Sequence, residues 1–394
     1  MLDVRTWIEI DERSLFFNLR QFQKRARPAR IMAVIKSNAY GHGLSLVAKL
    51  LANGESRIQN EELRGRGRNS KFLIPHPPLW FGVDSIVEAL RLRRDGIKNP
   101  ILVLGYTLPS RFKDAMRANI TITISHLDGL RDIAQSRARP DFHIKFDTGM
   151  HRHGFQEDEL TKLISNIKKY SLKPAGAYSH LATADDHAFS KKQIAVFDRC
   201  LEAFHAAGIH PKVIHFNKTE GILFYPRRDS LMRLGIGLYG YLPQPRRGAH
   251  TPRMPKDFVR PVMAWKTIVS EVKHIRKGEA IGYDLTYRFK HDAIIAVLPI
   301  GYWHGYDRGL SNCGEVLIHG KRASVRGRVC MDITMVETTH IPRVKIGDEV
   351  VLIGKQKQES ISADEIAAKI NTTAYEVLTR INPLIQRSLS GPQK

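Results

Sequence analysis

The chain has 394 residues, of which 42% are hydrophobic, so it is long enough for a large α/β domain and a smaller companion. Its 62 Lys and Arg against 39 Asp and Glu give a formal net charge of +23. The basic residues are spread along the whole chain and lack the interleaved aromatic residues of a base-stacking surface. We therefore expect a cationic surface and no dedicated nucleic-acid partner.

Three scattered cysteines, Cys200, Cys313 and Cys330, are too few for a disulfide framework, and no Cys/His cluster suggests a metal site. The opening MLDVRTWIEIDERSL lacks the apolar core of a signal peptide, and no apolar run is long enough to span a bilayer. We expect a cytoplasmic protein without a membrane partner.

From residue 31 onward, short β-branched runs alternate with amphipathic helical patterns such as SIVEALRLRRDGI, within a barrel domain expected over residues 11–245. Eight β-α units in series predict a closed (β/α)8 TIM-type barrel. An open doubly wound sheet is the alternative, but the chain has no GxGxxG turn. The predicted strands are IMAVIK (31–36), WFGVD (80–84), ILVLG (101–105), ITITIS (120–125), FHIKFD (142–147), AGAYSHL (175–181), VIHFN (213–217) and RLGIGLYG (233–240).

Three further segments complete the predicted organisation. The first barrel helix should end near Asn53, and residues 55–79 then form an inserted loop on the face away from the catalytic rim. After a proline-rich boundary near residue 245, residues 246–394 form a mainly β domain with strands such as WKTIVSEVKHI (265–275) and one helix, SADEIAAKI. The strand predicted in residues 1–10 is a candidate member of that β domain.

Polar residues gather at the carboxyl ends of the predicted barrel strands, where such barrels build their active sites. Lys36 ends the first strand, and from its position alone a solvated lysine is the favoured interpretation. A lysine partly desolvated in a barrel mouth can instead form a Schiff base. The other rim residues are Lys145, Asp147, Arg152, His180, Asn217, Arg233 and Gly235.

The sequence IMAVIKSNAYGHG around Lys36 resembles the cofactor-lysine signature of alanine racemases, barrel-type enzymes that use pyridoxal 5'-phosphate. Further segments resemble that family in order, over nearly the whole chain outside the insertion. They are HIKFDTGMHRHGF, YSHLATAD, LMRLGIGLYG, RPVMAWKT, GEAIGYDLTY, VLPIGYWHGYDRGLSN, GRVCMDITMV and TAYEVLTRI.

The resemblance implies a homodimer and a mechanism with two catalytic bases. Two bases suit a racemase, because removing the α-proton on one face of the substrate and returning a proton on the other requires a group on each side. The resemblance assigns the cofactor and one base to Lys36, and the other base to Tyr283, which would reach in from the partner subunit. Judged by its pattern alone, Tyr283 is more simply a packed aromatic residue in a strand. Arg152 and His180 match residues that surround this tyrosine.

The resemblance places Arg233 against the pyridine nitrogen of the cofactor. An arginine does not give up its proton there, which favours racemisation over transamination or decarboxylation. The resemblance also implies that the backbone of Gly235 and Ile236 and the hydroxyls of Tyr40 and Tyr375 hold the phosphate. The resemblance also assigns His180 and Asn217 to cofactor binding. It assigns Arg152, Met331 and Asp332 to substrate binding. Lys145, which is carbamylated in some members of the family, would orient Arg152.

Two departures stand out. The seventh strand continues as HFNKTEG where the family has Asn-Ser-Ala, so Lys218 stands in place of a serine that binds the phosphate. Lys218 could contact the phosphate directly, or Thr219 could supply the hydroxyl, or the cofactor could bind more weakly. His304 replaces an aspartate in GYWHGYDR.

The predicted function is interconversion of L- and D-alanine, which supplies D-alanine for peptidoglycan. A racemase of another small amino acid such as serine, and a pyridoxal-phosphate-binding protein with little activity, are the alternatives. Carriers of the second kind are typically lone barrels, so the β domain speaks against it.

Overall fold

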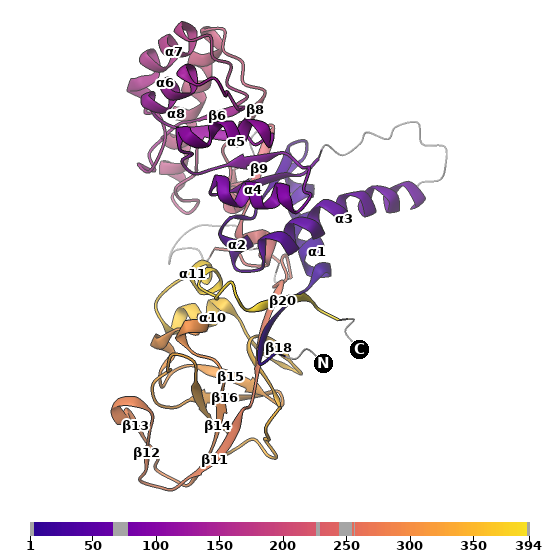
Figure 1. Cartoon of the computed structure of the whole chain (residues 1–394), viewed down its shortest axis with the longest axis vertical. Coiled ribbons are helices and arrows are strands. Elements are labelled where there is room, and N and C mark those ends of the chain that lie inside the picture. The colour runs from indigo at the N-terminus through magenta and orange to yellow at the C-terminus, as the bar shows by residue number, and fades with distance from the viewer. Residues whose placement is uncertain (1–3, 66–77, 226–228, 244–253, 256, 392–394) are drawn as a thin grey trace. The chain divides into compact units, whose positions relative to one another are not determined.

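A computed structural model describes residues 4–65, 78–225, 229–243, 254–255 and 257–391. By its internal contacts the chain divides into two compact units (Figure 1). The barrel unit comprises Leu15–Ala39 and Leu44–Arg260, and the β unit comprises Met1–Ser14, Tyr40–Gly43 and Pro261–Lys394. Among the described residues, no helix combines the length and the hydropathy that crossing a membrane requires.

Eight parallel strands form the barrel unit in two hydrogen-bonded runs, β4-β3-β2-β9 and β5-β6-β7-β8. The runs are joined on one side by the amide of Thr121, which donates to the carbonyl of Ile101 over 2.9 Å, and on the other by the amide of Ser230, 3.0 Å from the carbonyl of Ile214. The predicted barrel is therefore confirmed. Its strands are β2 (Arg30–Val34), β3 (Trp80–Val83), β4 (Ile101–Val103), β5 (Ile122–Ile124), β6 (Phe142–Lys145), β7 (Gly176–Tyr178), β8 (Val213–His215) and β9 (Leu231–Leu234).

The segments between these strands form helices, because their apolar residues recur at helical spacing. In α1, for example, Leu15, Leu19, Phe22 and Ala26 are all buried. Ser85 and Glu88 form a capping box that starts α4. The helices are α1 (Glu12–Ala26), α3 (Leu44–Gly65), α4 (Ile86–Arg94), α5 (Phe112–Arg117), α6 (Leu127–Gln135), α7 (Leu160–Lys169), α8 (His187–Ala206) and α9 (Thr219–Phe224).

The interior is packed by side chains from different strands. Met32, Leu102, Val213 and Leu231 form a buried cluster drawn from β2, β4, β8 and β9. Burying an aliphatic side chain of this size stabilises a fold by roughly 1.5–3 kcal/mol. The apolar residues thus hold the barrel closed and leave its polar residues to the site.

Two sequence-based expectations for the barrel were wrong in detail. The first barrel helix does not end near Asn53, because α3 continues to Gly65, so the start of the predicted inserted loop is helical; residues 66–77 lie outside the described part. The predicted strand 233–240 is instead β9 followed by a 3₁₀ turn at Ile236–Tyr239. A side chain at Gly237 would lie 2.5 Å from the ring of Phe22, so this close turn requires glycine.

The division between the units falls after Arg260, whereas composition had suggested residue 245. Arg260 belongs with the barrel because its guanidinium lies 3.8 Å from the ring centroid of Phe17 and its amide donates to Asn18 Oδ1 over 2.7 Å. Most of the proline-rich boundary segment, residues 244–253, lies outside the described residues.

The β unit contains a sheet with the order β11-β14-β17-β16-β15-β18-β10-β1-β20. The amino-terminal strand β1 (Thr6–Ile10) pairs antiparallel with β10 and parallel with β20. The predicted strand 265–275 is two strands, β10 and β11. The remaining elements are β10 (Met263–Ile268), β11 (Glu271–Ile275), β12 (Ala280–Ile281), β13 (Tyr287–Arg288), β14 (Ala293–Leu298), β15 (Glu315–Ile318), β16 (Lys321–Val325), β17 (Thr334–Glu337), β18 (Glu349–Gln356), β19 (Glu359–Ile361), β20 (Gln386–Leu389), α10 (Ala363–Lys369) and α11 (Ala374–Thr379).

Candidate active site

Lys36 follows β2 at its carboxyl end, as the sequence predicted. Its Nζ lies 2.9 Å from Oδ1 of Asp84, which follows the neighbouring strand β3. Both side chains are partly exposed, so this ion pair adds little stability. It places the lysine amine next to Asp84 at the barrel rim. Asp84 was missed as a site residue, although its position directly after WFGV was a signal.

Lys36 leads into a left-handed turn, α2 (Lys36–Tyr40). The φ angles of Ser37, Asn38, Ala39 and Tyr40 lie between 51° and 56°. Each such residue costs about 1–2 kcal/mol relative to right-handed backbone. Hydrogen bonds offset this cost: the amide of Leu44 donates to Asn38 Oδ1 (2.9 Å), and the amide of Ser37 donates to Glu88 Oε1 (2.7 Å). The turn therefore fixes the backbone that carries Lys36.

Arg233 lies within β9, is 3% exposed, and is the centre of a buried network. Its Nη2 donates to the carbonyls of Ser179 (2.7 Å) and Phe216 (2.8 Å) and to Nδ1 of His180 (3.1 Å). Its Nη1 donates to Nδ1 of His215. Burial lowers the pKa of Arg233 to about 10, so it stays charged at neutral pH.

The network continues away from Arg233 through two histidines. Because arginine only donates, Nδ1 of His215 must accept, and the proton of this imidazole lies on Nε2. Nε2 lies 2.9 Å from Nδ1 of His143, which then accepts in turn. Burial, with the charge of Arg233, lowers the pKa of His143 to about 3 and those of His180 and His215 well below their ordinary value. The three imidazoles are therefore neutral, and Arg233 keeps its charge among them.

Lys145 ends β6 and is buried, with its Nζ 5.6 Å from the ring centroid of Tyr178. Burial, followed by the positive charges of Arg152 and Arg233, lowers its pKa to about 8. Near Lys145 the chain turns at Asp147, whose Oδ1 accepts from the amides of Gly149 (2.9 Å), Met150 (3.0 Å) and His151 (3.0 Å). Burial raises the pKa of Asp147, but these bonds outweigh it and the pKa lies below its ordinary value. This turn leads directly into Arg152.

Between β8 and α9, a hydroxyl meets the backbone that the sequence assigned to phosphate. Oγ1 of Thr219 lies 3.2 Å from the amide nitrogen of Gly235 and 3.4 Å from that of Gly237. Nζ of Lys218 instead lies 3.0 Å from Oε1 of Glu220. Lys218 and Thr219 are the two residues that could replace the phosphate-binding serine of the family. Of these, Thr219 has its hydroxyl beside the amide of Gly235, and Lys218 is paired with Glu220. The adjacent Asn217 is buried and donates from Nδ2 to the carbonyl of Tyr225 over 2.7 Å.

The remaining predicted residues belong to the β unit. The rings of Tyr40 and Tyr375 are 6.0 Å apart between centroids. Nearby, a side chain at Gly41 would lie 2.0 Å from the carbonyl oxygen of Leu378, so this approach requires glycine. The structure thus brings the two proposed phosphate tyrosines together.

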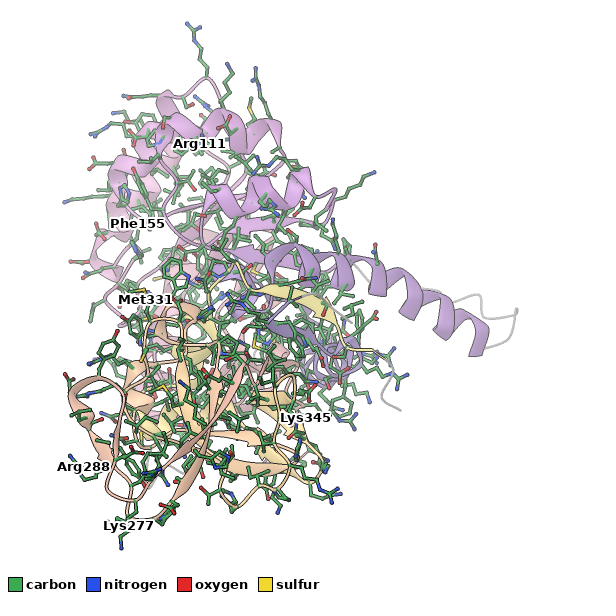
Figure 2. All side chains as sticks on the ribbon, turned by 60° about the horizontal axis from the view of Figure 1, so that its bottom comes forward. Arg111, Phe155, Lys277, Arg288, Met331 and Lys345 are labelled. Carbon is green, nitrogen blue, oxygen red and sulfur yellow. The ribbon has the colours of Figure 1, made fainter. Side chains whose placement is uncertain are left out.

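Tyr283 and Met331 are not packed within their own unit. Tyr283, in the turn between β12 and β13, is 70% exposed, and Met331, labelled in Figure 2, is 55% exposed. The expectation from pattern alone, that Tyr283 is a packed aromatic residue, is therefore wrong. Oδ1 of Asp332 lies 3.8 Å from Nδ1 of His304. Burial lowers the pKa of His304.

Comparison with known proteins gives one consistent family over both units. The sequence model for "Alanine racemase, N-terminal domain" matches residues 10–60 and 79–243, and that for "Alanine racemase, C-terminal domain" matches residues 262–389. Alanine racemase of Carboxydothermus hydrogenoformans is 38% identical, over 97% of this chain and 98% of that protein. The corresponding protein of Leptospira interrogans is 33% identical, over 97% and 95%.

Solved structures agree. Alanine racemase of Clostridium difficile 630 superimposes with a TM-score of 0.85 at 31% identity, covering 100% of this chain and 98% of that one. Alanine racemase of Bacillus anthracis with bound L-Ala-P also gives 0.85, at 30% identity, covering 100% and 97%.

Proposed function

Because the chain belongs to the alanine racemase family, we propose that it interconverts L- and D-alanine with pyridoxal 5'-phosphate and so supplies D-alanine for peptidoglycan. The observation that carries this proposal is the buried, charged Arg233 held by neutral imidazoles in a barrel whose rim presents Lys36. A buried charge is costly to keep, so an arginine placed here indicates a site that uses its charge.

The residues present fit the cofactor. Lys36 offers a primary amine at the rim. The amide of Gly235, which donates to Thr219 Oγ1 in this structure, would turn to a bound phosphate together with the amide of Ile236 and the Thr219 hydroxyl. Within the described part of the chain, Arg233 forms its hydrogen bonds through Nη1 and Nη2, so Nε would be the group to meet the ring nitrogen. Tyr40 and Tyr375 complete the set proposed to hold the phosphate. When bound, pyridoxal phosphate supplies an electron sink for negative charge at the substrate α carbon.

Two groups of the chain exchange the α-proton in this proposal. Nζ of Lys36 holds or releases it on one face of the substrate, and Oη of the partner subunit's Tyr283 does so on the other. The exposure of Tyr283, together with that of Leu285 and Met331, supports a role across a subunit interface rather than inside its own unit. The backbone of Met331 and its neighbour Asp332 are proposed to meet the substrate there.

Arg152 is proposed to bind the substrate carboxylate, supported by Lys145. The charge of Arg152 contributes to the lowered pKa of Lys145, so the two groups interact electrostatically. A lysine with a pKa near 8 is partly neutral in mildly alkaline solution, which is the form that reacts with carbon dioxide. Carbamylation of Lys145 would replace a repulsive neighbour of Arg152 by an attractive one.

Arg233 restrains the reaction to racemisation. A guanidinium donates and does not accept, so it presents a hydrogen bond to the ring nitrogen without giving up its proton. The neutral states of His180 and His215 reinforce this, since neither adds a transferable proton beside Arg233. We propose that this arrangement disfavours transamination.

The same proposal includes a homodimer in the cytoplasm. Shared sites require the dimer, and the free cysteines Cys200, Cys313 and Cys330 suit a reducing compartment.

The decisive experiment measures D-alanine formation from L-alanine by the purified full-length chain with added cofactor, with L-serine in parallel. We expect conversion of alanine and a visible absorbance band, lost in Lys36→Ala. Preference for serine would identify another small-amino-acid racemase, and a band without conversion would identify a binding protein.

Tyr283→Phe tests the second base in the same assay. It should reduce racemisation and leave the absorbance band in place, because the hydroxyl is removed without touching Lys36. Tyr170→Phe, at the end of α7, is the matched tyrosine variant and should convert alanine at the original rate.

A further inference from the structure

Lys218 and Glu220 form an ion pair in the segment that follows β8. Nζ of Lys218 lies 3.0 Å from Oε1 of Glu220, and the two side chains are 23% and 12% exposed. The other carboxylate oxygen of Glu220, Oε2, is buried and has no hydrogen-bond partner among the described residues. A carboxylate in such surroundings depends on a cationic partner, which among the described residues is Lys218, because an unpaired buried charge is strongly destabilising.

The pair stands on either side of Thr219 in the chain. Thr219 is the residue whose hydroxyl lies 3.2 Å from the amide nitrogen of Gly235, in the proposed phosphate site. The positive charge of Lys218 also contributes to the lowered pKa of His180, after burial and the charge of Arg233. Lys218 therefore acts electrostatically on His180, while its ammonium contacts Glu220.

A lysine ammonium has three donors and no preferred plane, so it can exchange one oxygen ligand for another without moving far. A phosphate dianion next to Thr219 would attract Lys218 and repel the carboxylate of Glu220. The two anions thus compete for one cation.

We propose that Glu220 is an internal counter-anion that competes with the cofactor phosphate for Lys218 and so sets the affinity of the phosphate site. This inference rests on the proposed cofactor site. In the absence of phosphate Glu220 neutralises Lys218, which keeps weakly bound monoanions out. A doubly charged phosphate ester, with more charge and three acceptor oxygens, displaces Glu220 from Lys218.

Glu220→Gln is the direct test, because glutamine keeps the shape and one acceptor oxygen and replaces the negatively charged carboxylate by a neutral amide. The cofactor-free full-length chain is titrated with inorganic phosphate by calorimetry and with pyridoxal phosphate by absorbance. We expect both to bind about tenfold more tightly, equivalent to about 1.4 kcal/mol. The matched control is Glu315→Gln, which alters a similar pair, with Lys369 Nζ 2.7 Å from Glu315 Oε2 in the β unit, and should leave both affinities unchanged.

Lys218→Met should weaken phosphate binding, because it removes the cation and leaves Glu220 beside the anion. Adding Glu220→Gln to Lys218→Met should recover part of the loss, so that the two substitutions are not additive. Thermal unfolding checks that each variant is folded, and Lys218→Gln replaces Lys218→Met if that variant is not.

Unchanged or weaker phosphate binding by Glu220→Gln would show the inference to be wrong, as would no phosphate binding by any of these proteins. The proposed function fails separately: absence of D-alanine formation, with phosphate binding tightened by Glu220→Gln, would refute the racemase proposal and leave the counter-anion role standing.

Discussion

Nη2 of Arg233 donates to Nδ1 of His180 across 3.1 Å, and both side chains lie inside the barrel. The direction of this bond is fixed because a guanidinium cannot accept. His180 therefore carries its proton on Nε2 and is neutral, in agreement with a pKa that burial and Arg233 lower well below the ordinary value. The bond joins β9 to the residues that follow β7, so Arg233 also links two parts of the barrel.

Arg233→Lys should destabilise the protein although it keeps the positive charge. A lysine cannot serve both imidazoles and the carbonyls of Ser179 and Phe216 at once, which leaves buried polar groups unsatisfied. We expect the free energy of unfolding, measured with urea, to fall by about 3 kcal/mol. Arg199→Lys, at an exposed pair with Glu157, should leave the free energy of unfolding nearly unchanged. Equal effects of the two variants would contradict this account of Arg233.

His143 should make stability depend on pH in the acid range. Its pKa is lowered to about 3 in the folded chain, against 6.5 ordinarily, so between these values the unfolded chain binds the additional proton. The free energy of unfolding therefore falls as pH falls from about 6.5 towards 3. In His143→Gln this fall should be less steep by about 1.4 kcal/mol per pH unit.

The measurement is denaturant unfolding of both proteins at several pH values from 4 to 7. His205→Gln, an exposed histidine at the end of α8, should retain the slope of the unsubstituted chain. Parallel curves for His143→Gln and the unsubstituted chain would mean that His143 is charged in the folded state.

Asn38 should be important for the left-handed turn after Lys36. Asn38→Ala removes the acceptor for the amide of Leu44 and places a residue with no local side-chain hydrogen bond at φ 56°. We expect a loss of about 2 kcal/mol in the free energy of unfolding. Asn38→Gly also removes the acceptor but tolerates positive φ, so its loss should be smaller by about 1 kcal/mol. The reverse order, measured by urea unfolding, would show that backbone conformation is not what Asn38 contributes.

The repeating pattern of the chain was sufficient to predict the barrel. Each apolar run, from IMAV to VIH, became a parallel strand, because a strand buried on both faces must be apolar over its length. Lys36 and Lys145 were found for the same reason, since a polar residue directly after such a run stands out. Arg233 stood out as well, although it lies within its strand.

The local deviations were harder to predict. The glycines of GIGLYG are compatible with a strand or a turn, and only the folded chain shows that a side chain at Gly237 would collide with the ring of Phe22. The helical part of the insertion lacks the apolar periodicity that identifies a helix packed on a core. From the sequence, both Lys218 and Thr219 were candidates for the place of the phosphate-binding serine. Only the folded chain shows that the Thr219 hydroxyl lies beside the amide of Gly235.

By itself, the sequence determined the fold class, the family, and the residue types available for the chemistry, because these follow from periodicity and from the order of motifs along the chain. Only the tertiary structure decided which groups are charged and which way their hydrogen bonds run. His143 and His215 are neutral because strands β6 and β8 bury them in line with Arg233, and Lys218 is paired because Glu220 folds back to it. Protonation states depend on burial and on neighbours distant in sequence, and these exist only once the chain has folded.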